Sequence, residues 1–433
     1  MGCSSSNTLT KNSENNNENP QKENPNENNE ETNSLKNLLK KPNLYTSFNF
    51  NKSLLSNSNL LLYTTYLNTG NEFLSIVENS KEKTEKLSFK SSNHAIAIGY
   101  KKGYKLEFVN QDKFFVLLNG AIDAYCIIDG HGPFGNKVAQ TCQDILFEYL
   151  LNLDQNSFES DYEKSLNEIF EKINRKIINR EEKTYGNYDP FLSGVAVTLL
   201  IRIKTMIFCA NVGNVLATIF HTDKLMPSKF NITELSFNDS NFNEDLLNNH
   251  NNNLLINGNN NNIGNNGNNA NNATNNNNKL DVKDNETEVE SLINPIEINL
   301  EIRRIYEHGG EMRKLLGETK SRIFVKGKYF PGLINTRSLG DQIGKGIGIL
   351  SLPHITTYKL SKGISYYLLM CSDGINNVFP IIKLVNIIQE NEQLLLESVK
   401  NIMADSKAMY RAHSYTPDMT IIIKEIKIED NLI

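Results

Sequence analysis

The sequence predicts an α+β fold in which strands pair with strands and helices are grouped between them. Eight short runs rich in β-branched and aromatic residues recur from residue 95 onward, most of them joined by tight connections. Helix-periodic segments come in separate blocks rather than after every strand. This order favours antiparallel sheets over an alternating parallel arrangement.

The expected strands are short apolar runs, and the turns between them set their pairing. They cover 95–100, 113–118, 124–129, 195–202, 206–210, 215–220, 366–371 and 419–426. The turn at Lys204–Thr205 and the corner at Gly213–Asn214 are tight, so we expect antiparallel neighbours on either side of each.

Four helices are expected between these strands. Apolar residues at three- and four-residue steps predict a helix over 158–180. Another is expected over 136–151, and two more lie within 379–412, where Pro380 is tolerated in a first helical turn.

Two Asn-rich stretches cannot form a core and leave a shorter folded region within the 433 residues. Residues 1–34 contain 11 Asn, and residues 248–278 contain 20 Asn in 31 positions. We therefore expect a disordered tether over 1–50 and a folded domain over 93–428, interrupted by a disordered insertion at 240–285. Residues 51–90 have no assigned role.

Composition excludes several classes of protein. No apolar run reaches the roughly 18 residues of a membrane-spanning helix. A net charge of −5 argues against nucleic-acid binding, which requires a basic field. Cys126, Cys209 and Cys371 lie in apolar runs without any CxxC pair, which indicates reduced core thiols rather than disulfides or zinc ligands.

The chain opens Met-Gly-Cys-Ser-Ser-Ser, a pattern typical of acylated proteins. Gly2 followed by Ser6 fits N-myristoylation, and Cys3 can supply a second anchor by S-palmitoylation. Two acyl chains would hold the protein on the cytoplasmic face of a membrane, which we expect to be the plasma membrane. The alternative is an ordinary disordered N-terminus that begins with Met-Gly.

Four acidic residues occupy the ends of apolar strands: Asp112, Asp129, Asp373 and Asp418. In antiparallel neighbours the end of one strand lies beside the start of the next, so all four can gather on one edge of a sheet. Crowded carboxylates repel unless cations lie between them, and oxygen ligands suit Mg²⁺ or Mn²⁺. Each Asp-Gly pair alone would be an ordinary turn. Together, and with His131 beside them, they predict a metal site.

Eight motifs stand in a fixed order around these residues. They are NQD (110–112), DGHGPFG (129–135), SGVAVTLL (193–200), ANVGN (210–214), EIRRIYEHGGEM (301–312), PGLINTRSLGD (331–341), CSDGINNV (371–378) and PDMTIII (417–423). This series resembles the metal-dependent Ser/Thr protein phosphatases of type 2C, the PPM family. The resemblance implies a four-layer α/β/β/α sandwich of two antiparallel sheets flanked by helices.

The resemblance also implies a set of ligands for two Mg²⁺ or Mn²⁺ ions. They are Asp112, Asp129, the carbonyl of Gly130, Asp373 and Asp418. Asp129 matches the carboxylate that bridges the two ions. Gln111 and Asp112 match a pair on the first strand that is Glu-Asp in many family members and Gln-Asp in others. A water between the ions would attack phosphorus, and His131 would protonate the departing Ser or Thr oxygen.

The sequence departs from the family pattern at three places. No Arg stands near the first strand to bind the substrate phosphate, and Lys102 or Lys105 would substitute as a point charge. Asn214 and Asn377 replace two acidic residues that hold a third, weaker ion in the family. Asp341 is expected to brace the flap region rather than bind metal.

The favoured interpretation is an active, membrane-tethered Mg²⁺- or Mn²⁺-dependent phosphatase that acts as a monomer on phosphorylated proteins and does not bind nucleic acid. The alternative is a weakly active pseudophosphatase that serves as a membrane-tethered binding or scaffold protein. Asn214, Asn377 and the missing Arg favour that alternative.

Overall fold

The computed structural model describes a folded unit within Asn59–Ile433. The described residues are 61–64, 72–77, 96–104, 109–118, 122–179, 190–222, 230–234, 289–291, 295–316, 318, 320–391, 394–412 and 415–428. The tether expected at 1–50 and the insertion expected at 240–285 lie outside them, as do Gly2, Cys3 and Lys105.

The first large sheet is antiparallel and contains four of the expected strands. Its order is β1 (Leu61–Thr64), β4 (Lys113–Leu118), β5 (Ile122–His131), β6 (Gly194–Ile203), β7 (Met206–Val212) and β15 (His354–Lys359), with β14 (Leu339–Gly340) pairing with β6. Lys113 lies opposite Ile128, so the start of β4 meets the end of β5.

The second large sheet contains the other four expected strands. Its order is β10 (Val289–Ser291), β9 (Phe230–Glu234), β8 (Leu216–Thr222), β16 (Ser365–Cys371), β17 (Met419–Lys427), β3 (Ile96–Lys101) and β2 (Glu72–Val77). All of its pairs are antiparallel except β9 with β10. Residues 51–90, which had no assigned role, thus contribute one strand to each large sheet, β1 to the first and β2 to the second.

One expected pairing is wrong. The Gly213–Asn214 corner does not join antiparallel neighbours, because β7 belongs to the first sheet and β8 to the second. Gly213 has a φ of 83°, and a Cβ there would lie 2.6 Å from the Cβ of Ala196. The corner is therefore a tight passage between sheets that only glycine allows.

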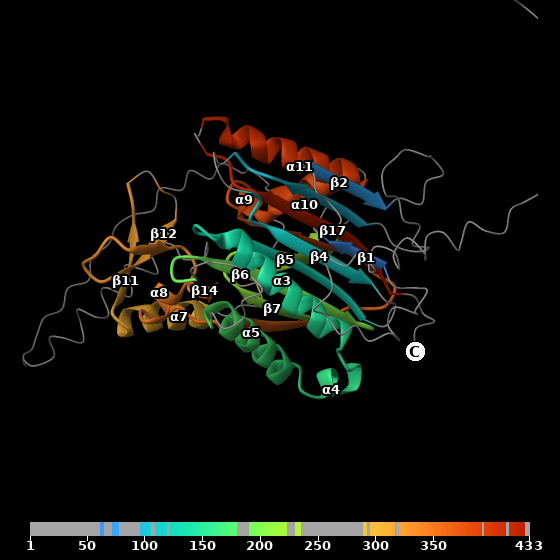
Figure 1. Ribbon diagram of the computed structural model, residues 1–433. Coiled ribbons are helices and arrows are strands. Elements are labelled where there is room, and N and C mark those ends of the chain that lie inside the picture. Colours follow the sequence, from blue (N-terminus) through green and yellow to red (C-terminus); the bar gives the residue numbers. More distant parts are fainter. Residues whose placement is uncertain are drawn as a thin grey trace, which may run out of the picture. The chain divides into compact units, whose positions relative to one another are not determined.

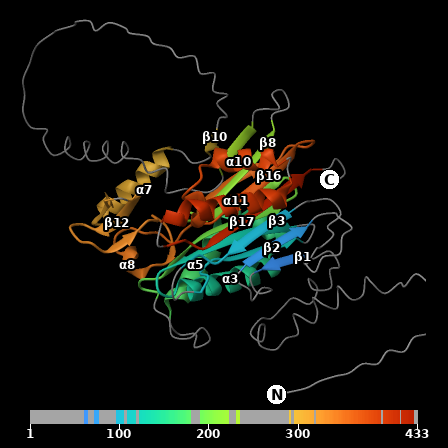
Figure 2. The ribbon, with the colours of Figure 1, turned by 90° about the horizontal axis from the view of Figure 1, so that it is seen from above.

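Apolar side chains from both large sheets form a buried core between them, including Ile98, Phe114, Tyr125, Leu368 and Ile422. Helices cover the two outer faces, as Figures 1 and 2 show. α3 (Gly135–Leu151), α4 (Gln155–Ser160) and α5 (Tyr162–Ile178) lie on the side of the first sheet. α9 (Asp373–Asn376), α10 (Ile381–Glu390) and α11 (Leu395–Met409) lie on the side of the second.

The helix expected over 158–180 is divided in two. Asp161 ends α4 and caps α5, because its side chain accepts a hydrogen bond from the backbone N–H of Lys164 at 3.1 Å. Asp at an N-cap satisfies a donor that the helix leaves unpaired. Phe158, the first residue of the expected helix, therefore lies on α4.

A third, smaller sheet goes beyond the two expected ones. It consists of β11 (Gly310–Lys314), β12 (Ser321–Val325) and β13 (Pro331–Leu333), next to α7 (Pro295–Glu307) and α8 (Gln342–Lys345). It lies to one side of the large sheets in Figure 1. The α+β class is confirmed, with several antiparallel sheets rather than two.

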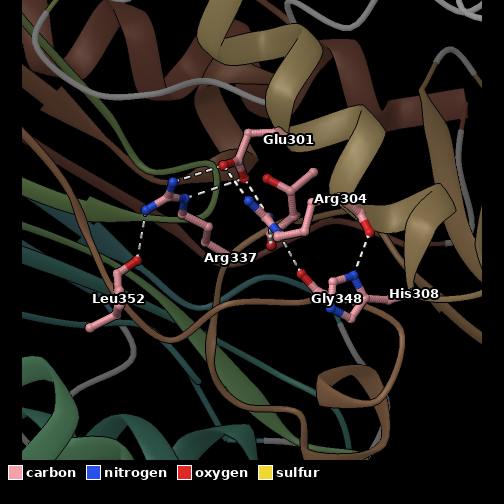
Figure 3. Close-up of polar contacts among 7 residues, drawn as sticks. Glu301, Arg304, His308, Arg337, Gly348 and Leu352 are labelled. Carbon is pink, nitrogen blue, oxygen red and sulfur yellow. Dashed lines mark hydrogen bonds and ion pairs between the residues drawn. The ribbon is translucent and has the colours of Figure 1, made fainter.

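Glu301 on α7 joins this region to the rest of the protein. Figure 3 shows its carboxylate between two guanidinium groups. Arg304 Nη2 lies 2.6 Å from Oε2, and Arg337 Nη2 lies 2.7 Å from Oε1. Arg304 also donates to the Gly348 carbonyl at 2.7 Å, and Arg337 to the Leu352 carbonyl at 3.0 Å. The cluster thus ties α7 to the chain that follows β13.

None of the helices within the described residues is long and apolar enough to cross a membrane. Cys126, Cys209 and Cys371 are buried free thiols, as expected, and so is Cys142.

We predict that Glu301→Ala lowers the free energy of unfolding by about 3 kcal/mol or more, because it leaves two half-buried guanidinium groups without their carboxylate. Urea denaturation measures this loss. Glu307→Ala is the matched control on the same helix, since its pair with Arg303 is more than half exposed and is worth less than about 1 kcal/mol.

The contribution of Glu301 to the free energy of unfolding depends on pH. Burial would raise the pKa of Glu301, but its bonds to Arg304 and Arg337 outweigh burial and lower it to about 2. The stabilisation is therefore present above the unfolded-state pKa of 4.5 and is lost as pH falls toward 2. Equal losses from Glu301→Ala and Glu307→Ala at neutral pH would contradict this role.

Candidate metal centre

The four strand-end carboxylates lie on two sheets rather than on the edge of one. Asp112 precedes β4 and Asp129 lies in β5, both in the first sheet. Asp373 follows β16 and Asp418 precedes β17, both in the second. The expected single edge is wrong, because pattern alone does not show which strands share a sheet. Within each sheet the paired residues come from adjacent antiparallel strands, as expected.

Asp112 joins the two sheets at this end. Its Oδ2 accepts hydrogen bonds from Ser372 Oγ at 2.8 Å and Thr420 Oγ1 at 2.7 Å, both from the second sheet. The side chain is buried, and burial together with the charge of Asp418 raises the pKa of Asp112 to about 7. A carboxylate held in this way retains strong attraction for a cation.

Asp418 is buried and makes the reciprocal connection. Its Oδ2 accepts from the backbone N–H of Gln111 at 2.9 Å, and its Oδ1 from that of Gly103 at 2.8 Å. Gln111 Nε2 in turn donates to the Gly132 carbonyl at 2.8 Å. Gln111 therefore links Asp418 to the DGHG loop rather than acting as a charged residue.

Asp129 and Asp373 are half-buried and lie side by side. The backbone N–H of Asp373, in the first turn of α9, donates to Asp129 Oδ2 at 3.2 Å. Gly130 is buried beside them, and a Cβ there would lie 2.6 Å from the Gly135 carbonyl and 2.7 Å from the Gln111 carbonyl. The glycine is therefore required by close backbone packing.

The donor set fits hard divalent cations. Carboxylate and carbonyl oxygens are the ligands that Mg²⁺ and Mn²⁺ prefer. The raised pKa of Asp112 reflects burial and negative charge that a cation would offset. Within the described part of the chain, no three or more His, Cys, Asp or Glu side chains are grouped closely enough to hold a metal ion as they stand. Asp112 is affected by the charges of both Asp418 and Asp373, and the backbone N–H of Asp373 donates to Asp129.

His131 ends β5, and its ring faces a second acidic residue. His131 Nε2 lies 2.7 Å from Asp341 Oδ2. Burial alone would lower the pKa of His131, but the charge of Asp341 and this hydrogen bond outweigh it and raise the pKa above its ordinary value. The imidazolium form is therefore favoured, as a proton donor requires.

The structure assigns Asp341 a partner that sequence reasoning missed. Its carboxylate contacts His131, and the side chain is buried. Burial would raise the pKa of Asp341, but the charge of His131 lowers it below its usual range. Asp341 has a φ of 46°, and a Cβ on Gly194 would lie 2.3 Å from its Oδ2. A strained conformation and a neighbouring glycine both accommodate this carboxylate.

Lysines near this end of the sheets occupy different positions. Lys102 lies between β3 and Gly103, hence at the same end of the second sheet as Asp418. Lys113 Nζ donates to the backbone carbonyls of Asn110 and Asp112 at 3.2 and 3.1 Å. Lys105, the other candidate for phosphate binding, lies outside the described residues.

Asn214 and Asn377 both lie next to this site. Asn214 is buried, and its backbone carbonyl accepts a hydrogen bond from Asn376 Nδ2 at 2.7 Å. This bond joins the Gly213–Asn214 corner to α9. Asn377 is exposed at the end of α9, and its Nδ2 lies 3.3 Å from Asp373 Oδ2. An aspartate at position 377 could not make this contact, because two carboxylates repel.

Comparison with known proteins identifies the family. The family model described as Protein phosphatase 2C matches residues 76–244 and 296–414. The "Probable protein phosphatase 2C 35" of Arabidopsis thaliana is 22% identical over 323 residues, which cover 73% of this chain and 79% of that protein. The serine-threonine phosphatase 2C of Toxoplasma gondii shares the fold, with a TM-score of 0.52 at 11% identity over 78% of this chain and 96% of that one.

The family model spans well over half of the chain and includes Asp112, Asp129, His131 and Asp373; its match ends at 414, before Asp418. The resemblance drawn from the eight motifs is therefore confirmed. The protein belongs to the protein phosphatase 2C family of metal-dependent serine/threonine protein phosphatases.

Proposed function

We propose that this protein hydrolyses phosphoserine and phosphothreonine in proteins with two Mg²⁺ or Mn²⁺ ions held between the two large sheets. One observation carries the proposal: Asp112 and Asp129 of the first sheet meet Asp373 and Asp418 of the second beside a His–Asp pair. We interpret the stacked helices and sheets as the four-layer sandwich that the resemblance implied.

The ions would be held by Asp112, Asp129, the Gly130 carbonyl, Asp373 and Asp418. When bound, they lower the pKa of a shared water and neutralise charge that develops on the phosphoryl group. His131 is the proposed donor of a proton to the departing Ser or Thr oxygen. Its Nε2 is hydrogen-bonded to Asp341, which orients the imidazole and favours its protonated form, so the transferred proton would come from Nδ1.

We expect phosphopeptide hydrolysis to require Mg²⁺ or Mn²⁺ and to cease in EDTA. Asp129→Asn should lower kcat/KM by about 10³-fold, because a metal ligand supplies several kcal/mol of transition-state stabilisation. Steady-state kinetics with a phosphothreonine peptide measure this. Asp405→Asn, an exposed position on α11, is the control.

The same assay separates the enzyme from a scaffold. Undiminished activity in a chelator, with metal content shown to be nil, would refute the two-ion proposal. Correctly folded wild-type protein that binds metal but does not turn over the peptide would favour the pseudophosphatase alternative, which Asn214 and Asn377 support.

A second prediction concerns Asp341, which acts through His131 as a positioning residue. Asp341→Asn should slow phosphopeptide hydrolysis by about 10- to 100-fold, because an alkoxide leaving group needs a proton. Hydrolysis of p-nitrophenyl phosphate should fall far less, since p-nitrophenolate leaves without one. The ratio of the two kcat values is the measurement.

His131→Gln is the matched variant for this test. It should show the same dependence on the leaving group, and the double variant should be no slower than His131→Gln alone, because the two residues act as a unit. Equal losses with both substrates after Asp341→Asn would mean that Asp341 supports the fold only.

We further propose that Gly2 and Cys3 carry acyl chains that place the enzyme on the cytoplasmic face of the plasma membrane. The support is the Met-Gly-Cys-Ser-Ser-Ser pattern alone. Gly2→Ala should release the protein into the soluble fraction on cell fractionation. Cys3→Ser should give loose, reversible attachment, because one myristoyl chain binds membranes only marginally. Unchanged membrane association of Gly2→Ala would refute the proposed anchor.

A further inference from the structure

A lysine of the third sheet reaches the candidate metal centre through a single amide group. Lys320, the residue before β12, places its Nζ 2.7 Å from Asn377 Oδ1. The Nδ2 of the same amide lies 3.3 Å from Asp373 Oδ2. Lys320, Asn377 and Asp373 thus form a continuous polar chain from the third sheet to a strand-end carboxylate of the second.

The chemistry of Asn377 suits both contacts. A carboxylate needs a donor and an ammonium group needs an acceptor, so the amide can serve both in only one orientation. An aspartate at this position would bind Lys320 but repel Asp373. Asn377 therefore holds a positive charge close to Asp373 without adding a negative one.

Lys320 is positioned by regular structure. The next residue, Ser321, pairs with Lys314 at the start of the β11–β12 ladder. Arg322, one residue further, donates to the Gly332 carbonyl at 2.9 Å and pairs with Glu318 at 2.7 Å. The base of the Lys320 side chain is thus defined by the third sheet.

A positive charge near Asp373 would offset the repulsion between the acidic residues of the site and a negatively charged substrate. The side chains of Asp112, Asp129, Asp373 and Asp418 repel an incoming phosphoryl dianion. The ammonium group of Lys113 lies against backbone carbonyls. Lys320, by contrast, is bound to the side-chain amide of Asn377, an exposed residue whose amide also contacts Asp373.

We propose that Lys320 binds the phosphoryl group of the substrate and that Asn377 positions it. The inference rests on the phosphatase function proposed above. Lys320 contributes a point charge and a single hydrogen bond, in contrast to the two-pronged contact of an arginine. It replaces Lys102 and Lys105 as the phosphate-binding residue.

The test compares Lys320→Met and Lys320→Arg with Lys314→Met, an exposed lysine of the same hairpin. Binding of inorganic phosphate to Mg²⁺-loaded protein is measured by titration calorimetry, and KM and kcat with a phosphothreonine peptide. Lys320→Met should weaken phosphate binding and raise KM by about tenfold, with kcat changed less than about threefold. Lys320→Arg and Lys314→Met should stay within about threefold of wild type.

Asn377→Ala tests the positioning role, because it keeps the lysine but removes the amide. Asn377→Ala should weaken phosphate binding less than Lys320→Met does. In the double variant, the additional loss caused by Lys320→Met should be smaller than the loss that Lys320→Met causes in the wild-type protein.

Two results would overturn the proposal. One is phosphate binding by Lys320→Met equal to that of wild type. The other is an additional Mn²⁺ bound by Lys320→Met in a metal titration, which would mean that the ammonium group fills a cation position instead. Because calorimetry follows binding and not turnover, the result stands even if wild-type protein fails to hydrolyse the peptide, which would refute only the proposed function.

Discussion

The structure depends on the convergence of four carboxylates at one end of two facing sheets. Asp112 accepts hydrogen bonds from Ser372 and Thr420 of the opposite sheet, and Asp418 accepts from Gln111 in return. These bonds fix the spacing of the sheets where the apolar core ends. They also keep acidic side chains close together, with Asp112 at a pKa raised to about 7. Such an arrangement is costly for the bare protein and favourable once divalent cations bind.

Around this centre, the surrounding elements each place one of the groups to which we assign a role. β5 ends on His131, and the strained turn before α8 brings Asp341 to its ring. α9 directs the backbone N–H of Asp373 at Asp129. The residue before β12, Lys320, contacts Asn377. The proposed acid, metal ligands and phosphate contact therefore come from different parts of the fold, each held by its own buried or paired neighbour.

The strands and helices were largely predictable, because β-branched runs and helical periodicity are local properties of the chain. Sheet membership was not, since a corner as short as Gly213–Asn214 is compatible with a hairpin and with a passage between sheets. The candidate ligands could be named from strand ends and motifs. The partners Asp341 for His131 and Lys320 for Asn377 could not, because they are separated by 210 and 57 residues, and no local pattern encodes such contacts.

The central claim is that this carboxylate cluster holds two divalent cations. The most direct measurement is a crystal structure of the protein grown with Mn²⁺, with the ions located by their anomalous scattering. The account predicts two peaks per chain, with Asp129, Asp373 and Asp418 among the residues that would hold the ions. Saturating Mn²⁺ with no peak at these carboxylates, or with peaks only elsewhere on the protein, would contradict it.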